Sequence, residues 1–149
     1  MLVPAAVLVL FVLGAIAVDF SIAFLAQREL SAAAAAAAND AAGASVSDDA
    51  FYSGREPGRI VLDAAHAGAI ADAAVAARRV QGVHDVSTNT DVAADRVCVT
   101  ITGQVDYIFA KAIPGAARGR TITGQAVATA VRNDGSPAGV AGAVCGRQR

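Results

Sequence analysis

The sequence predicts an α+β protein, in which an N-terminal transmembrane helix continues into an alanine-rich helix and precedes a further helix packed on a small antiparallel β-sheet. Three observations support this prediction. No charged side chain occurs before Asp19, and seven consecutive alanines (32–38) follow among other good helix formers. Beyond Gly82, apolar residues alternate with polar ones, which is typical of strands.

The N-terminal segment is long enough to cross a membrane. The 17 residues from Leu2 to Val18 are uncharged and almost all apolar. Extended to Ala26, the helix would be about 37 Å long at about 1.5 Å per residue, which exceeds a hydrocarbon core of about 30 Å. Asp19 would then lie near the far interface and not at the bilayer centre, where a carboxylate costs most. We interpret this segment as an uncleaved, single-span anchor.

Two other interpretations of the segment stay open. A secretory signal peptide would use the small residues Ala15–Ala17 as its cleavage site, although no basic residue precedes the apolar run. A prepilin-like site would place the cut at Gly14, with the acidic Asp19 five residues later. In that case most of the apolar stretch would lie before the cut, and the processed N-terminus would be short.

The residues that flank the span predict opposite orientations. Arg28, the first basic residue, follows the span, so the positive-inside rule favours a cytoplasmic C-terminal part. The pair of cysteines and the threonine-rich strands favour an extracytoplasmic one. A short basic leader before Met1 would reconcile the two, and a translation start mapped to Met1 would exclude that hypothesis.

Composition divides the chain into four parts. Residues 1–42 form the anchor and its alanine-rich helical extension. The alanine run carries no large side chain, so it either packs against an element that approaches closely or stands in solvent. Residues 43–58 are rich in turn formers and acids and predict a linker. Residues 59–132 form the α+β domain, and residues 133–149 form a Gly- and Pro-rich tail.

The domain begins with a predicted helix over residues 60–80. Arg78 and Arg79 lie in its last turn, where a helix dipole favours cations, and Gly82 would end it. Asp63 and His66 are three residues apart and lie on one face of this helix. No further donors stand at metal-ligand spacing, so we expect only a surface pair.

Three strand-like stretches follow, over 83–92, 96–109 and 120–132, with a turn at Asp95 and an interruption at Pro114. In the second, alternation puts Val97, Val99 and Ile101 on one face and Cys98, Thr100 and Thr102 on the other. It continues through Val105, Tyr107 and Phe109. Short connections predict an antiparallel meander covered on one face by the 60–80 helix.

The two cysteines, Cys98 in a predicted strand and Cys145 in the tail, are the natural candidates for a disulfide. In an exported domain this bond would tie the tail to the sheet and contribute about 3–4 kcal/mol in the chain-entropy model. The alternative is two unpaired thiols, one buried as a small apolar side chain and one exposed.

Nothing in the sequence predicts catalysis. His84 and Asp85 are neighbours in a predicted strand, so we expect them on opposite faces, which excludes a simple dyad. We find no phosphate-binding glycine loop, nucleophile elbow or carboxylate cluster. The formal net charge of −1 gives no basic field for nucleic acid. We therefore expect a protein that is not an enzyme, with no catalytic residue, metal, cofactor or small-molecule substrate.

The stretch AVDFSIAFLAQRELSAAAAAAANDAAGAS, residues 17–45, resembles the N-terminal signature of TadE/TadG-like proteins of the Flp (tight adherence, type IVb) pilus assembly system. The positions that carry the resemblance are Asp19, Ser21, Phe24, Arg28 and Leu30. Ser21 stands where glycine is usual in the family, and Phe24 where tyrosine is usual. The Thr- and Val-rich stretches up to residue 132 also resemble the strands of the family.

The resemblance implies a membrane-anchored structural or accessory protein of pilus assembly, such as a minor pseudopilin-like subunit. It would be a single-pass protein of the cytoplasmic membrane with its C-terminal region extracytoplasmic, and its partners would be the lipid bilayer and other pilus or secretion proteins. The candidate assembly contacts are Asp19, Phe24, Arg28 and Leu30. Arg28 lies about 180° round the helix from Asp19, so we expect Asp19 to face water, headgroups or a donor on a neighbouring subunit. The alternative function is a secreted, disulfide-stapled binding module released by signal peptidase.

Overall fold

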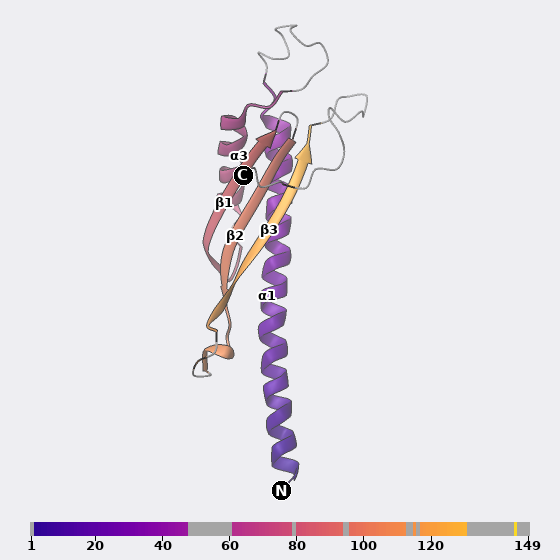
Figure 1. Ribbon diagram of the computed structural model, residues 1–149, viewed down its shortest axis with the longest axis vertical. Coiled ribbons are helices and arrows are strands. Elements are labelled where there is room, and N and C mark those ends of the chain that lie inside the picture. The colour runs from indigo at the N-terminus through magenta and orange to yellow at the C-terminus, as the bar shows by residue number, and fades with distance from the viewer. Residues whose placement is uncertain are drawn as a thin grey trace.

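The α+β architecture is confirmed by a computed structural model, which describes residues 2–47, 61–78, 80–93, 96–112, 115, 117–130 and 145. A single long helix supports a small domain along its C-terminal half (Figure 1). The elements in chain order are α1 (Leu2–Ala44), α3 (Ala64–Ala77), β1 (Val83–Ala93), β2 (Arg96–Asp106), the short 3-10 helix η1 (Ala110–Ala112) and β3 (Gly119–Thr129).

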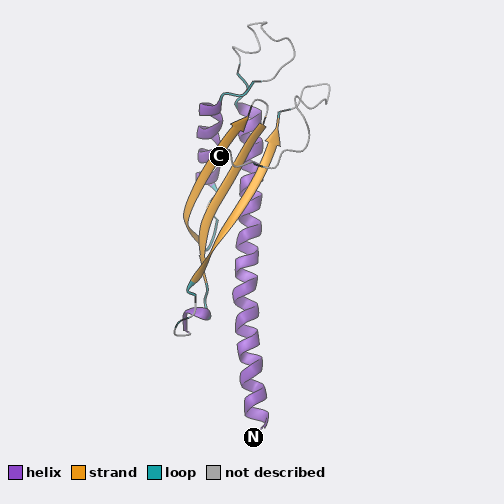
Figure 2. Ribbon diagram, in the orientation of Figure 1, coloured by secondary structure: helices purple, strands orange, loops and turns teal. Residues whose placement is uncertain are grey.

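The three strands form the predicted antiparallel meander, in the order β1-β2-β3. Strands β2 and β3 stay in register from the pair Arg96↔Thr129 to the pair Asp106↔Gly119. Helices α1 and α3 lie on the same side of the sheet (Figure 2), where α1 contacts β2 and β3 and α3 contacts β1. We expected the second helix to cover this face, but α1 covers the larger part of it.

Several element boundaries differ from the sequence prediction. Helix α3 begins later than residue 60, because the side chain of Asp63 accepts hydrogen bonds from the backbone N–H groups of Ala65 and His66 and caps the helix. It ends at Ala77, so Arg78 is the C-cap and not part of the last turn. Gly82 follows in a turn with φ of 75°.

Strand β2 ends at Asp106, so the predicted continuation through Tyr107 and Phe109 is wrong. Strand β3 ends at Thr129. Helix α1 continues to Ala44, into the start of the predicted 43–58 linker. Predictions for residues 48–58 of that linker, for Arg79, Asp95, Pro114 and Arg132, and for the tail apart from Cys145 lie outside the described residues.

The domain side of α1 is a narrow stripe of small side chains. Its buried residues follow one another at alternating spacings of four and three residues, the repeat of a packed helix face. The stripe comprises Asp19, Ala23, Ala26, Leu30, Ala33 and Ala37, and is widened near its end by Ala34, Ala38, Ala41 and Ala42. The alanine run is therefore a packing surface and not a solvated stalk.

Small side chains let the sheet come very close to this helix. A Cβ atom on Gly124 of β3 would lie 2.6 Å from the carbonyl carbon of Leu30 and 2.7 Å from the backbone nitrogen of Ser31. Leu30 itself is fully buried and packs in one cluster with Val97, Val99 and Ile101 of β2. These valines and Ile101 share the buried face of β2, as the alternation predicted.

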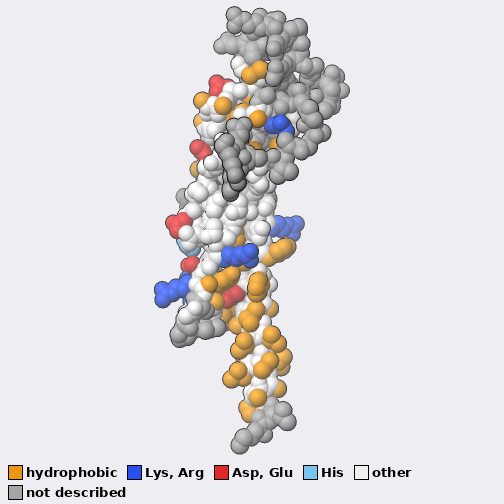
Figure 3. Space-filling view, viewed as in Figure 1, with side chains coloured by type: hydrophobic (Ala, Val, Ile, Leu, Met, Phe, Trp, Pro, Cys, Tyr) orange, Lys and Arg blue, Asp and Glu red, His pale blue; other side chains and the backbone are white. Residues whose placement is uncertain are grey.

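The described residues give the N-terminal half of α1 no such cover. Every large apolar side chain from Val3 to Val18 is at least 43% exposed, and apolar side chains surround the projecting end of the helix in Figure 3. By length and composition α1 is able to span a membrane, a test that a signal sequence near an N-terminus also meets. The helix thus has an uncovered apolar half and a packed half.

A disulfide and an isolated β-bridge also stabilise the domain. Cys98 and Cys145 form a disulfide, with their Cα atoms 5.8 Å apart. Cys98 lies on the face of β2 turned away from the helices, so this bond holds Cys145 against the outer side of the sheet. Near the same end of the sheet, where Val46 lies close to Ala128 and Thr129, Val46 pairs with Leu62 in an isolated antiparallel bridge.

We predict that Gly124→Ala destabilises the domain by about 1–3 kcal/mol, because the added methyl group forces β3 away from the α1 backbone. Gly68→Ala is the matched control, since nothing lies within 4 Å of its Cβ position in α3. That variant should gain about 0.5–1 kcal/mol from the better helix propensity of alanine. Denaturant unfolding of the full chain in detergent micelles measures both, and equal effects would contradict the close approach.

We also predict that removing the disulfide lowers the free energy of unfolding by about 3–4 kcal/mol, because the unfolded chain regains the entropy of an open loop. The measurement compares oxidised and reduced protein, and a Cys98→Ala/Cys145→Ala double variant under both conditions. The double variant should not respond to reductant. A stability that reduction leaves unchanged would show that Cys145 adds nothing to the domain.

Candidate functional site

A polar contact between residues far apart in the sequence joins α1 to the loop between β2 and β3. Asp19, the first residue of the buried stripe, is only 6% exposed. Its Oδ1 accepts hydrogen bonds from the backbone nitrogens of Ile108 at 2.8 Å and Phe109 at 3.1 Å. Its Oδ2 accepts one from the backbone nitrogen of Ala110 at 2.9 Å. We call this contact the Asp19 junction.

The local structure of the loop explains why its N–H groups are available. The chain leaves β2 at Asp106 and enters η1 at Ala110. The first N–H groups of a helical turn have no acceptor within the turn, and a carboxylate is the strongest side-chain acceptor for such groups. Asp19 therefore satisfies three loop amides, while these amides compensate the loss of water around the carboxylate.

The partner of Asp19 differs from the sequence expectation. Water, headgroups and a neighbouring subunit were the expected partners, but the donors belong to a loop of the same chain, 89 to 91 residues away. The spacing of Asp19, Ala23, Ala26 and Leu30 was the available signal, since it puts the aspartate on the same helix face as the buried small residues. Its role as an assembly contact remains a prediction.

A second polar contact fixes the base of the same loop. The Nζ atom of Lys111 lies 2.7 Å from Oδ2 of Asp106, at the end of β2. The hydrogen bond from Lys111 lowers the pKa of the Asp106 carboxyl, and the positive charges of Lys111 and His84 lower it further. The carboxylate is thus charged at neutral pH, and the ion pair is lost only as the pH falls through this lowered pKa.

The histidine beside this loop is not arranged as predicted. His84 and Asp85 were expected on opposite faces of a strand, but a bulge between His84 and Ser87 interrupts the alternation, and Asp85 has φ of 52°. His84 Nε2 consequently lies 3.9 Å from Asp85 Oδ2 and 4.0 Å from Asp106 Oδ1. All three side chains are largely exposed, so they form a solvated polar cluster.

Apolar side chains lie next to the junction on the side towards the N-terminus of α1. Ile108 is 61% exposed and Phe109 is 45% exposed. Phe109 and α1 enclose an open groove of about 510 Å³. The groove is lined by Val7, Leu10, Phe11, Gly14, Ala15, Val18 and Phe109.

The other residues of the family-like signature fall on two sides of α1. Leu30 is fully buried under the sheet, whereas Phe24 and Arg28 are exposed. Ser21 donates its hydroxyl proton to the backbone carbonyl of Ala17 at 2.8 Å, a bond within the helix. Asp19 and Leu30 therefore hold the domain, and Phe24 and Arg28 remain open to surroundings outside the chain.

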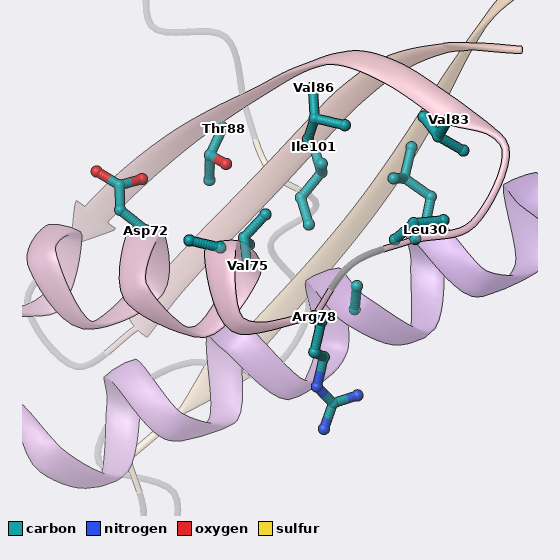
Figure 4. A pocket seen from close by; sticks show the side chains of 11 residues that line it. Leu30, Asp72, Val75, Arg78, Val83, Val86, Thr88 and Ile101 are labelled. Atoms are coloured by element: carbon teal, nitrogen blue, oxygen red, sulfur yellow. The ribbon is translucent and has the colours of Figure 1, made fainter.

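A second hollow, of about 520 Å³, lies between α3, β1 and α1 (Figure 4). Leu30, Val75 and Ile101 form its apolar wall. Its polar lining residues, Asp72, Arg78 and Thr88, are all at least partly exposed, and Arg78 points away from the sheet in Figure 4. Such a hollow lacks the buried polar groups that orient a small-molecule ligand.

Among the described residues, no three His, Cys, Asp or Glu side chains lie close enough together to hold a metal ion. The predicted pair of Asp63 and His66 is a helix cap that uses the backbone nitrogen of His66 and not its ring. Comparisons with known protein families, curated proteins and solved structures find no match to this chain.

We predict that Asp19→Asn loosens the β2–β3 loop, because the amide is uncharged and presents an NH₂ group where one acceptor oxygen stood. Hydrogen exchange at the backbone amides of Ile108, Phe109 and Ala110 should accelerate by roughly tenfold, the factor expected for one lost charge-assisted hydrogen bond. Asp40→Asn, at an exposed position of the same helix, is the matched control. Unchanged exchange in Asp19→Asn would contradict the junction.

Proposed function

We propose that this chain is a membrane-anchored structural protein of a Flp-type pilus assembly system, similar to the TadE/TadG-like proteins, with its α+β domain outside the cytoplasmic membrane. The observation that carries the proposal is the division of α1. Its C-terminal half forms the helical layer of the domain, while the large apolar side chains from Val3 to Val18 have no cover from the described chain. In water this surface would be costly, at about 25 cal/mol per Å².

The outward face of α1 supports a role in assembly. Phe20 is 62% exposed and Phe24 is 67% exposed, and Arg28 continues the same face, since the three are spaced by four residues. This row runs from the apolar half of the helix on to the level of the domain. It offers aromatic surface and one positive charge to lipid or to a neighbouring assembly protein.

The disulfide supports the extracytoplasmic location. Disulfides persist in oxidising compartments and are rare in the cytosol, and the Cys98–Cys145 bond lies on the outer side of the sheet. The role we propose is structural: the described surfaces are apolar helix faces and a polar sheet, suited to contacts with lipid and protein.

A secreted binding module is the second candidate, and the position of Asp19 favours it. Asp19 is the first residue of the buried stripe, so cleavage after Ala17 would remove the uncovered half of α1 and leave every domain contact of the stripe in place. The product would, however, keep Phe20, Phe24 and Leu25 exposed to water, each more than half accessible. This remaining apolar surface is why we prefer the anchor.

We predict that the full-length chain sediments with membranes and resists extraction at alkaline pH, because the apolar half of α1 stays in the bilayer. In spheroplasts, a membrane-impermeant maleimide should label the protein only after reduction, at Cys98 and Cys145. The Cys98→Ala/Cys145→Ala variant is the negative control, because it has no thiol for the maleimide to label.

Three outcomes contradict this prediction in different ways. Full-length protein in the soluble fraction would exclude the anchor. A mature N-terminus at Val18, found by mass spectrometry, would establish the secreted module. Labelling that requires lysis would place the domain in the cytoplasm.

A further inference from the structure

We propose that the β2–β3 loop is a second membrane contact, in which Ile108 and Phe109 insert among the lipid acyl chains of the leaflet nearest the domain. The inference rests on the proposed anchoring of α1 and adds a surface that the anchor alone does not require. It follows from the position of the loop along the helix, from the hydrogen bonds of its backbone N–H groups and from the groove beside it.

The Asp19 junction fixes the height of the loop. Three hydrogen bonds tie Ile108, Phe109 and Ala110 to one residue of α1. The segment Val3–Val18 below that residue is about 24 Å long at about 1.5 Å per residue, somewhat less than a hydrocarbon core of about 30 Å. A bilayer that covers this segment therefore reaches the level of Asp19 and of the loop tip bonded to it.

The junction also lowers the cost of placing the loop at that depth. A non-helical backbone is tolerated in hydrocarbon only where its polar groups are satisfied by protein. Here the N–H groups of three consecutive residues are bonded to the Asp19 carboxylate, and the N–H of Tyr107 donates to the carbonyl of Arg118 at 3.1 Å. Ile108 and Phe109 can thus enter the acyl-chain region without exposing unpaired amide protons.

The shape and lining of the groove indicate that a lipid acyl chain occupies it. It runs along α1 from Val7 to Val18, about 16 Å at the rise of a helix. Among the described residues, Phe109 is the one that lines it from outside α1. All of its lining side chains are apolar, and it opens beside the segment that we propose to lie in the bilayer. A lipid acyl chain has the apolar character and the length that fill such a groove.

The residues above the loop tip suit the headgroup level. The side chains of Lys111, Arg118 and Arg120 are exposed around the loop, and Figure 3 shows basic side chains where the apolar part of the helix meets the domain. Half-buried Tyr107 lies beside them. Aromatic and basic residues are enriched at this level of membrane proteins, where both find polar partners.

Tryptophan fluorescence tests the proposal, because the chain contains no tryptophan. Full-length Phe109→Trp and Ile108→Trp variants are reconstituted in phosphatidylcholine–phosphatidylglycerol liposomes whose acyl chains carry bromine near the headgroup or near the chain end. Phe11→Trp reports on the anchor, and Val61→Trp reports on an exposed site at the far end of the domain.

We expect emission from both loop variants to be blue-shifted relative to Val61→Trp and quenched most by the shallow bromines. Phe11→Trp should be quenched most by the deep bromines, and Val61→Trp by neither. Ile108→Trp keeps the test decisive if Phe109→Trp does not fold, as judged by circular dichroism.

The overturning results separate this inference from the anchor. Quenched Phe11→Trp together with loop variants that behave like Val61→Trp would overturn the loop contact and leave the anchor standing. An unquenched Phe11→Trp would overturn both. Loop variants that are blue-shifted but not quenched would mean that protein, such as a second copy of this chain, fills the groove, which also contradicts a lipid contact.

Discussion

The contact between one carboxylate and three backbone amides determines where the packed part of this molecule begins. N-terminal to Asp19, α1 makes no part of the core, and C-terminal to it the buried stripe repeats at spacings of four and three residues. The same contact places the β2–β3 loop against the helix. An apolar residue at position 19 would continue the helix equally well, but it could not accept the loop amides, whose burial without partners is costly.

The rest of the core follows from the small size of the residues on α1. Large side chains are few, and the fully buried ones are Leu30 and a group on β2 that includes Ile101. Alanine methyl groups on α1 and the absence of a side chain at Gly124 let the backbone of β3 approach the backbone of α1 closely. Van der Waals contacts between the two backbones then stabilise the core in place of large buried side chains. Such a core buries few large apolar side chains and so contributes little stability. The disulfide between Cys98 and Cys145, on the outer side of the sheet, adds stability that the core does not supply.

Sequence patterns predicted the features that depend on local periodicity. The two faces of β2 were predicted correctly, because alternation fixes which side chains share a face. The extension of that strand to Phe109 was wrong, because the N–H groups of Ile108 and Phe109 bind Asp19 instead of a neighbouring strand. Asp19 itself stood out as the first charge in an apolar run. Its partners could not be predicted, since backbone donors carry no residue-type signature and lie about 90 residues away along the chain.

The bridge between Val46 and Leu62 has a practical consequence for engineering. The backbone nitrogen of Ser47 lies 3.0 Å from the carbonyl oxygen of Val61, so the two ends of the intervening segment meet at one point on the domain. Lengthening a loop whose ends are already held together costs little, since the closure entropy grows only with the logarithm of its length. An epitope tag or a small fluorescent domain inserted between Ser47 and Val61 would be attached at the end of the domain farthest from the apolar half of α1, and would leave both the core and the Asp19 junction intact.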